Sequence, residues 1–248
     1  MKRIIGIISG KGGVGKTTLA INLSAAFHEF QVENVLVDAN LSNANLSLQL
    51  GMQYTPITLQ DVLNGEINVF HAIRIHPTGL RVIPTSISLN KLNADISRLS
   101  SVLAQLNSTV IVDFPPGIND EFKEILKACD EALVITNPEI PAVTDALKAI
   151  RIAHKLKKPI IGIALNRVRN EPFELSVREV EHLCEIPVIG VIPEDKRVRE
   201  ANSESLPVVF RNPYSKSAIA FKKLASAILG KAWEPPRFLR LRQILGRA

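Results

Sequence analysis

A glycine-rich loop near the N-terminus constrains this chain more than any other feature of its sequence. The loop reads Ser-Gly-Lys-Gly-Gly-Val-Gly-Lys-Thr-Thr over residues 9–18, between the apolar run Ile4–Ile8 and a helix predicted over Lys16–Phe30. Glycines let consecutive backbone N–H groups approach a phosphate without a Cβ in the way, and a helix N-terminus adds partial positive charge. The spacing G-x-x-x-x-G-K-T in this setting is the P-loop pattern, which predicts a nucleoside triphosphate site.

Side chains that would serve the phosphates and a Mg²⁺ ion are also recognisable. Lys16 is expected to reach the β- and γ-phosphates, and the Thr17 hydroxyl is expected to complete the Mg²⁺ shell. Asp113 ends an apolar run at the strand edge where α/β proteins bind ligands, so it is predicted to hold the water shell of the metal. An aspartate that only caps the next turn is the alternative. Asp38 ends another apolar run and is assigned to the same edge as a further metal-site residue.

The predicted cofactors are therefore ATP or ADP with Mg²⁺. The five histidines stand singly, without the spacing of a transition-metal site. Cys129 and Cys184 form no C-x-x-C pair, and they are expected to be buried free thiols. The loop residues expected to contact the nucleotide are Gly10, Lys11, Gly12, Gly13, Val14, Gly15, Lys16, Thr17 and Thr18.

The remaining periodicity predicts an α/β fold around this loop. Most apolar runs are continuous, as expected for parallel strands covered by helices on both faces, so a single-domain, doubly wound, mostly parallel sheet is predicted over residues 1–230. The strands are predicted at Ile4–Ile8, Val35–Asp38, Leu80–Pro84, Val110–Asp113, Ala132–Thr136, Ile160–Asn166 and Val188–Ile192. The helices are predicted at Lys16–Phe30, Leu59–Leu63, Ile96–Leu106, Phe122–Lys127, Pro141–Lys157 and Tyr214–Leu229. In the first helix, Leu19, Leu23, Phe27 and Phe30 share one face.

Residues 231–248 differ from the rest of the chain. They supply +4 of the net charge of +6, which leaves residues 1–230 nearly neutral. A helix begun after Pro236 would gather Phe238, Leu241, Ile244 and Leu245 on one side, with Arg240 on the opposite side. A short basic amphipathic helix can lie among the headgroups of an anionic membrane. The segment is predicted to be a membrane-targeting tail; a helix docked on the body and a solvated tail are the alternatives.

The apolar stretches also bear on where the protein is found. None approaches the roughly 20 apolar residues that a membrane-spanning helix needs. The strand-like run Ile4–Ile8 leaves no room for a signal peptide. We therefore expect a cytoplasmic protein that associates peripherally with the inner face of the cell membrane.

Lys11 makes the loop more specific than a general P-loop. The form Lys-Gly-Gly-x-Gly-Lys-Thr resembles the deviant Walker A loop of the MinD/ParA family of ATPases, and the chain looks most like the archaeal MinD-type members. Relatives with an iron–sulfur cluster or a C-terminal C-x-x-C are disfavoured, because the two cysteines match neither arrangement. The likeness covers about residues 1–230 and includes Asp38-Ala-Asn40 with Asn45-Leu-Ser-Leu48, Asp113-Phe-Pro-Pro-Gly117, Asn137-Pro-Glu139, Leu165-Asn166-Arg167 and Ile192-Pro-Glu-Asp195.

The resemblance implies roles for several further residues. Lys11 would cross the interface of an ATP-sandwich dimer and touch the phosphates of the partner subunit. Asn166 would hydrogen-bond the adenine edge, with Pro193 and Glu194 near the base. In the first switch region of the family the pattern is usually Asp-x-Asp, and the second carboxylate orients the attacking water. Here that position is Asn40, whose amide can hold a water but cannot accept its proton, so ATP binding is expected to survive and hydrolysis to be slow.

The leading hypothesis is a slowly hydrolysing, MinD-like dimerisation switch. In its ATP state it would associate with the membrane and position division or other surface machinery, together with an unidentified regulatory or effector protein. One alternative is a ParA-like partition ATPase whose tail arginines contact DNA phosphates. DNA binding is less favoured because it leaves the apolar residues of the tail unexplained. The other alternative, suggested by Asn40, is a nucleotide-bound scaffold that does not hydrolyse ATP.

Overall fold

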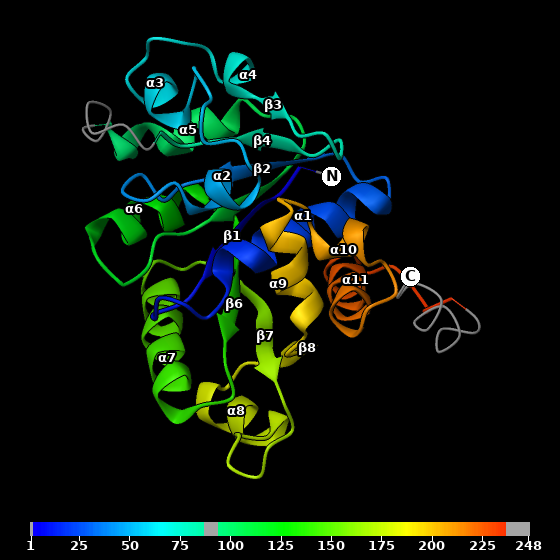
Figure 1. Ribbon diagram of the computed structural model, residues 1–248. Coiled ribbons are helices and arrows are strands. Elements are labelled where there is room, and N and C mark those ends of the chain that lie inside the picture. Colours follow the sequence, from blue (N-terminus) through cyan, green and yellow to red (C-terminus); the bar gives the residue numbers. More distant parts are fainter. Residues whose placement is uncertain (1, 87–93, 237–248) are drawn as a thin grey trace.

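The computed structural model describes residues 2–86 and 94–236 (Figure 1). Its centre is one sheet with the strand order β3-β4-β2-β5-β1-β6-β7-β8. Neighbouring strands run parallel except for β3 and β4, which form an antiparallel pair at one edge. The predicted mostly parallel, doubly wound sheet is therefore confirmed. The strands are β1 (Ile4–Ile8), β2 (Asn34–Asp38), β3 (Arg74–Ile75), β4 (Arg81–Ile83), β5 (Thr109–Asp113), β6 (Glu131–Thr136), β7 (Ile160–Val168) and β8 (Val188–Pro193).

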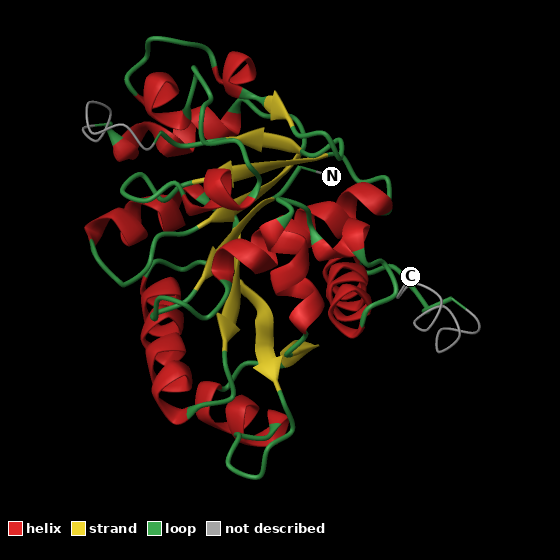
Figure 2. Cartoon of the chain, in the orientation of Figure 1, coloured by secondary structure: helices red, strands yellow, loops and turns green. Residues whose placement is uncertain are grey.

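Helices cover both faces of the sheet, as Figure 2 shows. Each helical layer closes a buried apolar core against its own face. One layer contains α3 (Leu59–Leu63), α4 (Val69–Ala72), α5 (Leu99–Ala104), α6 (Asp120–Ala128), α7 (Ile140–Lys155) and α8 (Val177–Cys184). The opposite layer contains α1 (Lys16–Glu29), α2 (Asn45–Gln49), α9 (Lys196–Ser203), α10 (Val208–Arg211) and α11 (Lys216–Leu229).

Helix α1 is not the one-sided amphipathic helix that the sequence pattern predicts. Leu19, Leu23 and Phe27 are buried as expected, whereas Phe30 lies just past the end of the helix and is half-buried. The alanines on its other sides are buried as well. Helices α10 and α11 pack on its outer side, so most of its circumference meets protein rather than water.

The sequence analysis did not predict several short elements, namely β3, α2, α4, α8, α9 and α10. Helix α9 buries only Ala201, so its sequence carries almost no apolar periodicity. The helix predicted over Ile96–Leu106 is instead a 3-10 turn (Ile96–Arg98) followed by α5. Asp95 explains the tight first turn, because its side chain accepts a hydrogen bond from the backbone N–H of Ser97.

The chain leaves the last helix close to the end of α1. Gly230 closes α11 with a left-handed φ of +62°, a conformation that glycine adopts without strain. The Trp233 ring lies 6.1 Å from the Phe30 ring, between centroids. The tail residues singled out above (Phe238, Arg240, Leu241, Ile244 and Leu245) lie outside the described residues. In the part that the structure describes, no helix has both the length and the apolar character needed to span a bilayer.

Candidate nucleotide-binding site

The P-loop connects β1 to α1 at the carboxyl edge of the parallel strands. Gly15 has a left-handed φ of +104°, and a Cβ there would lie 2.5 Å from Asn166 Nδ2, so only glycine fits. The Lys16 ammonium is buried and bridges the loop, donating a hydrogen bond to the backbone oxygen of Lys11 at 3.1 Å. Burial lowers the pKa of Lys16, while the nearby Asp113 carboxylate raises it. The loop therefore surrounds a buried positive charge, which suits a polyphosphate.

Two carboxylates face this loop from adjacent strands. The pairing of β2 with β5 puts Asp38 directly opposite Asp113. Thr17 Oγ1 donates to Asp113 Oδ2 at 2.7 Å, whereas Asp113 Oδ1 is buried without a hydrogen-bond partner. Asp38 Oδ2 accepts from Thr85 Oγ1 at 2.8 Å. Thr85, which holds Asp38 in place, follows β4 and carried no recognisable sequence signal.

Burial disfavours the charged form of both carboxylates. Burial raises the pKa of Asp113 to about 6, although the Thr17 hydroxyl and the Lys16 ammonium act in the opposite direction. Burial also raises the pKa of Asp38, and the negative charge of Asp113 adds to that effect. These two buried acids, one of which has an unpaired oxygen, lie beside the Thr17 hydroxyl. Together they form a donor set that a hard divalent cation would satisfy. The residues predicted to serve Mg²⁺ are thus brought together.

Asn40 lies two residues beyond the end of β2 and is 3% exposed. Its backbone N–H donates to Asp38 Oδ1 at 3.1 Å. Its side-chain oxygen accepts from the backbone N–H of Asn43 at 3.2 Å. The amide therefore caps the turn at residues 40–43, next to the two carboxylates.

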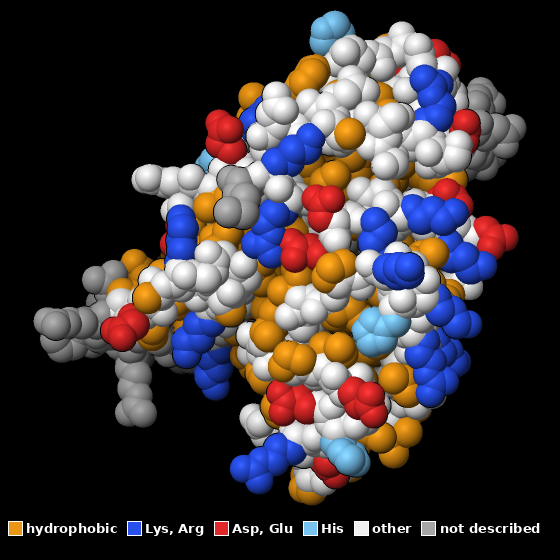
Figure 3. All heavy atoms as spheres, turned by 180° about the vertical axis from the view of Figure 1, so that it is seen from behind, with side chains coloured by type: hydrophobic (Ala, Val, Ile, Leu, Met, Phe, Trp, Pro, Cys, Tyr) orange, Lys and Arg blue, Asp and Glu red, His pale blue; other side chains and the backbone are white. Residues whose placement is uncertain are grey.

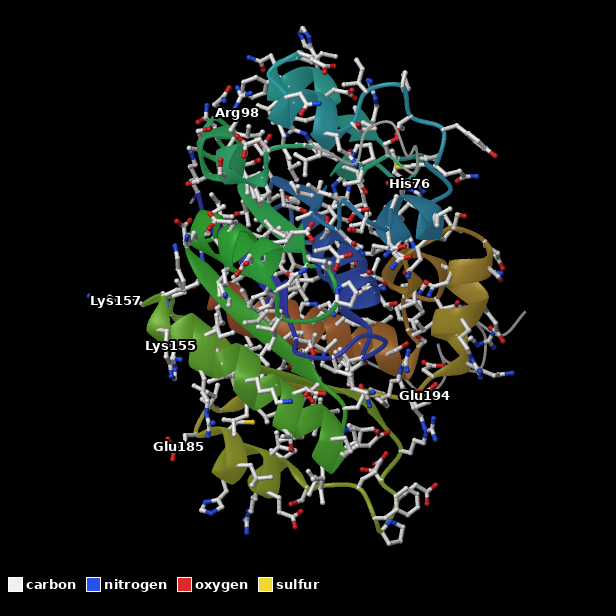
Figure 4. The ribbon with its side chains drawn as sticks, turned by 90° about the vertical axis from the view of Figure 1, so that its left-hand side faces the viewer. His76, Arg98, Lys155, Lys157, Glu185 and Glu194 are labelled. Carbon is white, nitrogen blue, oxygen red and sulfur yellow. The ribbon has the colours of Figure 1, made fainter. Side chains whose placement is uncertain are left out.

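A pocket of about 370 Å³ lies beside the loop and contains the residues expected near the base. Asn166, Pro193 and Glu194 line it together with Gly15 and Thr18; Glu194 is labelled in Figure 4. Asn166 Nδ2 donates to the backbone oxygen of Val14 at 2.7 Å, which ties β7 to the phosphate loop. Sequence reasoning assigned no role to the other lining residues: Arg167, Arg169, Ile192, Asp195, Val198, Arg199, Asn202 and Phe221.

Lys11 differs from the other lysine of the loop because its side chain is exposed.

Gly10 fixes the course of the loop. A Cβ at Gly10 would lie 2.0 Å from the backbone oxygen of Asp145 in α7, so the loop packs directly on that helix. The site thus combines a buried cation at Lys16 with an exposed one at Lys11.

Comparison with protein families agrees with this geometry. The ParA family model, described as NUBPL iron-transfer P-loop NTPase, matches residues 1–229. The chain belongs to the ParA family of P-loop NTPases.

Within this family the similarity is to MinD-type proteins. An ATP-binding protein of Methanocaldococcus jannaschii is 41% identical over 234 residues, covering 93% of this chain and 89% of that protein. The cell division ATPase MinD of Pyrococcus furiosus is 38% identical with a TM-score of 0.89, covering 93% of this chain and 99% of the other. The septum site-determining protein MinD of Pyrococcus horikoshii, solved with Mg-ADP, is 36% identical with a TM-score of 0.87, covering 92% and 96%. The resemblance to archaeal MinD-type proteins is therefore confirmed.

Proposed function

We propose that this protein is an ATP-driven dimerisation switch that associates with the membrane in its ATP state and positions division or other surface machinery. The observation that carries the proposal is the cluster at the P-loop of Thr17 with the buried Lys16, Asp113 and Asp38, in a chain similar to MinD. ATP or ADP with Mg²⁺ would occupy this set. The metal would be held by Thr17, with Asp113 and Asp38 holding its water shell, and when bound it neutralises phosphate charge.

The nucleotide contacts follow from the same geometry. Backbone N–H groups of residues 10–18 would cradle the phosphates, and the pocket lined by Asn166, Pro193 and Glu194 would receive the base. The unpaired Asp113 Oδ1 supports a metal-bound state, because a buried carboxylate oxygen without a donor is costly. The P. horikoshii protein with Mg-ADP is a precedent for this ligand in a chain of the same fold.

ATP-dependent dimerisation rests on Lys11. Its side chain is exposed on the surface of the subunit. A second copy that faced the loop would bring this side chain to the partner's phosphates. A positive charge delivered across the interface binds best when the γ-phosphate is present. ATP would therefore favour the dimer and ADP the monomer.

Hydrolysis is proposed to be slow because of Asn40. A carboxylate at this position would accept a proton from the attacking water, whereas the amide only orients it. A slow ATPase keeps the dimer assembled for longer, which suits a switch that waits for an effector protein.

Membrane association depends on the predicted tail at residues 231–248. One short amphipathic helix binds weakly, while two helices on one dimer bind together with higher avidity. This coupling would make attachment follow the nucleotide state. It predicts a peripheral protein at the inner face of the cell membrane.

Co-sedimentation with anionic liposomes tests the proposal. The wild-type chain should sediment with ATP and Mg²⁺ and stay in the supernatant with ADP. The variant Leu241→Glu with Leu245→Glu should stay in the supernatant in both states while binding ATP normally. Equal sedimentation of wild type and variant would contradict the role of the tail.

DNA binding is the second candidate, and the same assay with duplex DNA decides it. Figure 3 shows acidic and basic side chains interspersed on one face of the body. Lys123, Lys127 and Lys148 are each paired with a carboxylate on their own helix. ATP-dependent sedimentation with DNA but not with liposomes would favour this function, and its affinity should fall steeply with salt.

A further inference from the structure

The carboxylate at the end of β2 is held by a residue that follows a different strand. Thr85 lies two residues beyond the end of β4 and is 1% exposed. Its hydroxyl donates to Asp38 Oδ2 at 2.8 Å, while Asp38 Oδ1 accepts from the backbone N–H of Asn40 at 3.1 Å. Asp38 is fully buried, and each of its oxygens thus has a donor from outside the P-loop.

The sheet places Thr85 and Asp113 on opposite sides of Asp38. Strand β2 lies between β4 and β5, and the pairing brings Val37 level with Ile83 and Asp38 level with Asp113. The hydrogen bond from Thr85 therefore restrains the Asp38 carboxylate from the side of β4, away from the second acid. A donor fixed on one oxygen limits the rotation of a carboxylate, so it sets how that carboxylate faces a metal.

The segment that carries Thr85 is itself fixed by buried contacts. The backbone oxygen of Pro84 accepts from the backbone N–H of Leu59 at 2.8 Å. The backbone N–H of Ser86 donates to the side-chain oxygen of Gln60 at 3.0 Å. Leu59 and Gln60 begin α3, and both are fully buried. Because both chain neighbours of Thr85 are tied to α3, its hydroxyl has a defined place.

A hydroxyl can orient the carboxylate without cancelling its charge. A lysine or arginine in place of Thr85 would also donate to Asp38, but its positive charge would repel a divalent cation. A residue without a donor would leave Asp38 Oδ2 short of a partner in a buried site. Threonine satisfies the oxygen and keeps the negative charge available to a metal.

We infer that Thr85 is a positioning residue for the Mg²⁺ ion that accompanies the nucleotide. It acts through Asp38 and sets the direction in which that carboxylate holds the water shell of the metal. The inference rests on the proposed function and adds to its metal site a residue from the end of β4. Partners that orient metal-site groups typically contribute about 10- to 100-fold to metal affinity.

Cation binding tests the inference without requiring activity. Mn²⁺ prefers the same carboxylate and water ligands as Mg²⁺, and free Mn²⁺ is measured directly by electron paramagnetic resonance. Thr85→Val should weaken Mn²⁺ binding to the ADP complex about tenfold, whereas Thr85→Ser, which keeps the hydroxyl, should bind as the wild type does. ADP affinity in EDTA should be the same in all three proteins, since the P-loop is unchanged. Unaltered Mn²⁺ affinity in Thr85→Val would overturn the inference.

A second buried threonine provides the matched control. Thr136 ends β6 and is fully buried, but its hydroxyl donates to the backbone oxygen of Asn137 at 3.4 Å rather than to a carboxylate. Thr136→Val should therefore keep wild-type Mn²⁺ affinity, and an equal loss in both valine variants would contradict the inference. If Thr85→Val does not fold, Thr85→Cys takes its place with the same expected loss, because a thiol is a weak donor.

A double-mutant cycle shows whether Thr85 acts through Asp38. In the Asp38→Ala background, Thr85→Val should weaken Mn²⁺ binding no further, because the carboxylate that it positions is gone. A further loss as large as that in the wild-type background would mean that Thr85 acts independently of Asp38. That result contradicts a positioning role.

The same measurements separate the inference from the proposed function. A wild-type ADP complex that binds no Mn²⁺ would refute the proposed metal site and the inference with it. A wild-type chain that binds Mn²⁺ but never joins liposomes with ATP would refute the proposed switch, while the Thr85 comparison would still decide the inference. Normal liposome recruitment with wild-type Mn²⁺ affinity in Thr85→Val would refute only the inference.

Discussion

In the proposed site, Lys16 is the residue on which nucleotide binding should depend most directly. Its buried ammonium already spans the P-loop, where it lies 3.1 Å from the Lys11 backbone oxygen. Lys16→Ala should abolish ATP binding in calorimetry, because no other side chain places a charge between the β- and γ-phosphates. Lys11→Ala is the control from the same loop and should bind ATP in the monomer. Normal ATP affinity in Lys16→Ala would show that the site is wrongly assigned.

Asp113 should make the stability of the empty protein depend on pH. Its pKa is raised from 3.8 to about 6, so the folded state binds more protons than the unfolded state between about pH 4 and pH 6. The stabilising contribution is complete below that window and is lost as the pH rises through it. The loss should be on the order of 3 kcal/mol in denaturant unfolding without Mg²⁺. Asp113→Asn should flatten this dependence; an unchanged slope would mean that Asp113 is ionised in the empty protein.

Asn40 offers a gain-of-function test. Asn40→Asp should raise ATP turnover roughly tenfold or more, since it adds a group that can accept a proton from the attacking water. Nucleotide affinity should stay the same, because the phosphates are bound by other residues. Steady-state phosphate release measured beside ATP binding checks both statements. Unchanged turnover would indicate that the side chain at this position does not face the γ-phosphate.

At the scale of elements, the P-loop depends on its packing against α7. A Cβ at Gly10 would meet the Asp145 backbone oxygen at 2.0 Å, whereas at Gly12 the nearest atom is Pro116 Cβ at 3.4 Å. Gly10→Ala should therefore destabilise the nucleotide-free protein by about 2 kcal/mol, and Gly12→Ala should have little effect. Denaturant unfolding of the two variants checks the difference. Equal stabilities would show that the loop does not rest on α7.

The sequence predicts the strands better than the short helices and the contacts between distant segments. The strands that carry the site were predicted to within a few residues, because continuous β-branched runs flanked by turns are a strong signal. Helices α8 and α9 were missed, since each places only one or two residues in a core. Pairing partners of the site residues, such as Thr85 with Asp38, depend on tertiary contacts between distant segments. Only the folded arrangement revealed them.

At the scale of the whole molecule, the proposed switch couples two separate regions. The nucleotide edge carries Lys11 and the switch turn at Asn40, while the chain leaves the body at Trp233, which packs against Phe30 near the end of α1. The nucleotide site lies at the carboxyl ends of the strands, whereas α1 runs from that edge to the opposite one. In the proposed mechanism, dimerisation carries the signal from ATP to the tail. It doubles the number of tails without any change in the tail itself.

Sedimentation velocity with each nucleotide tests this central claim most directly. The wild-type chain should sediment as a dimer with ATP and Mg²⁺ and as a monomer with ADP. Lys11→Ala should remain a monomer with ATP although it binds the nucleotide, because it lacks the charge that reaches the partner's phosphates. A wild-type chain that stays monomeric with saturating ATP, or a Lys11→Ala protein that dimerises fully, would contradict the account.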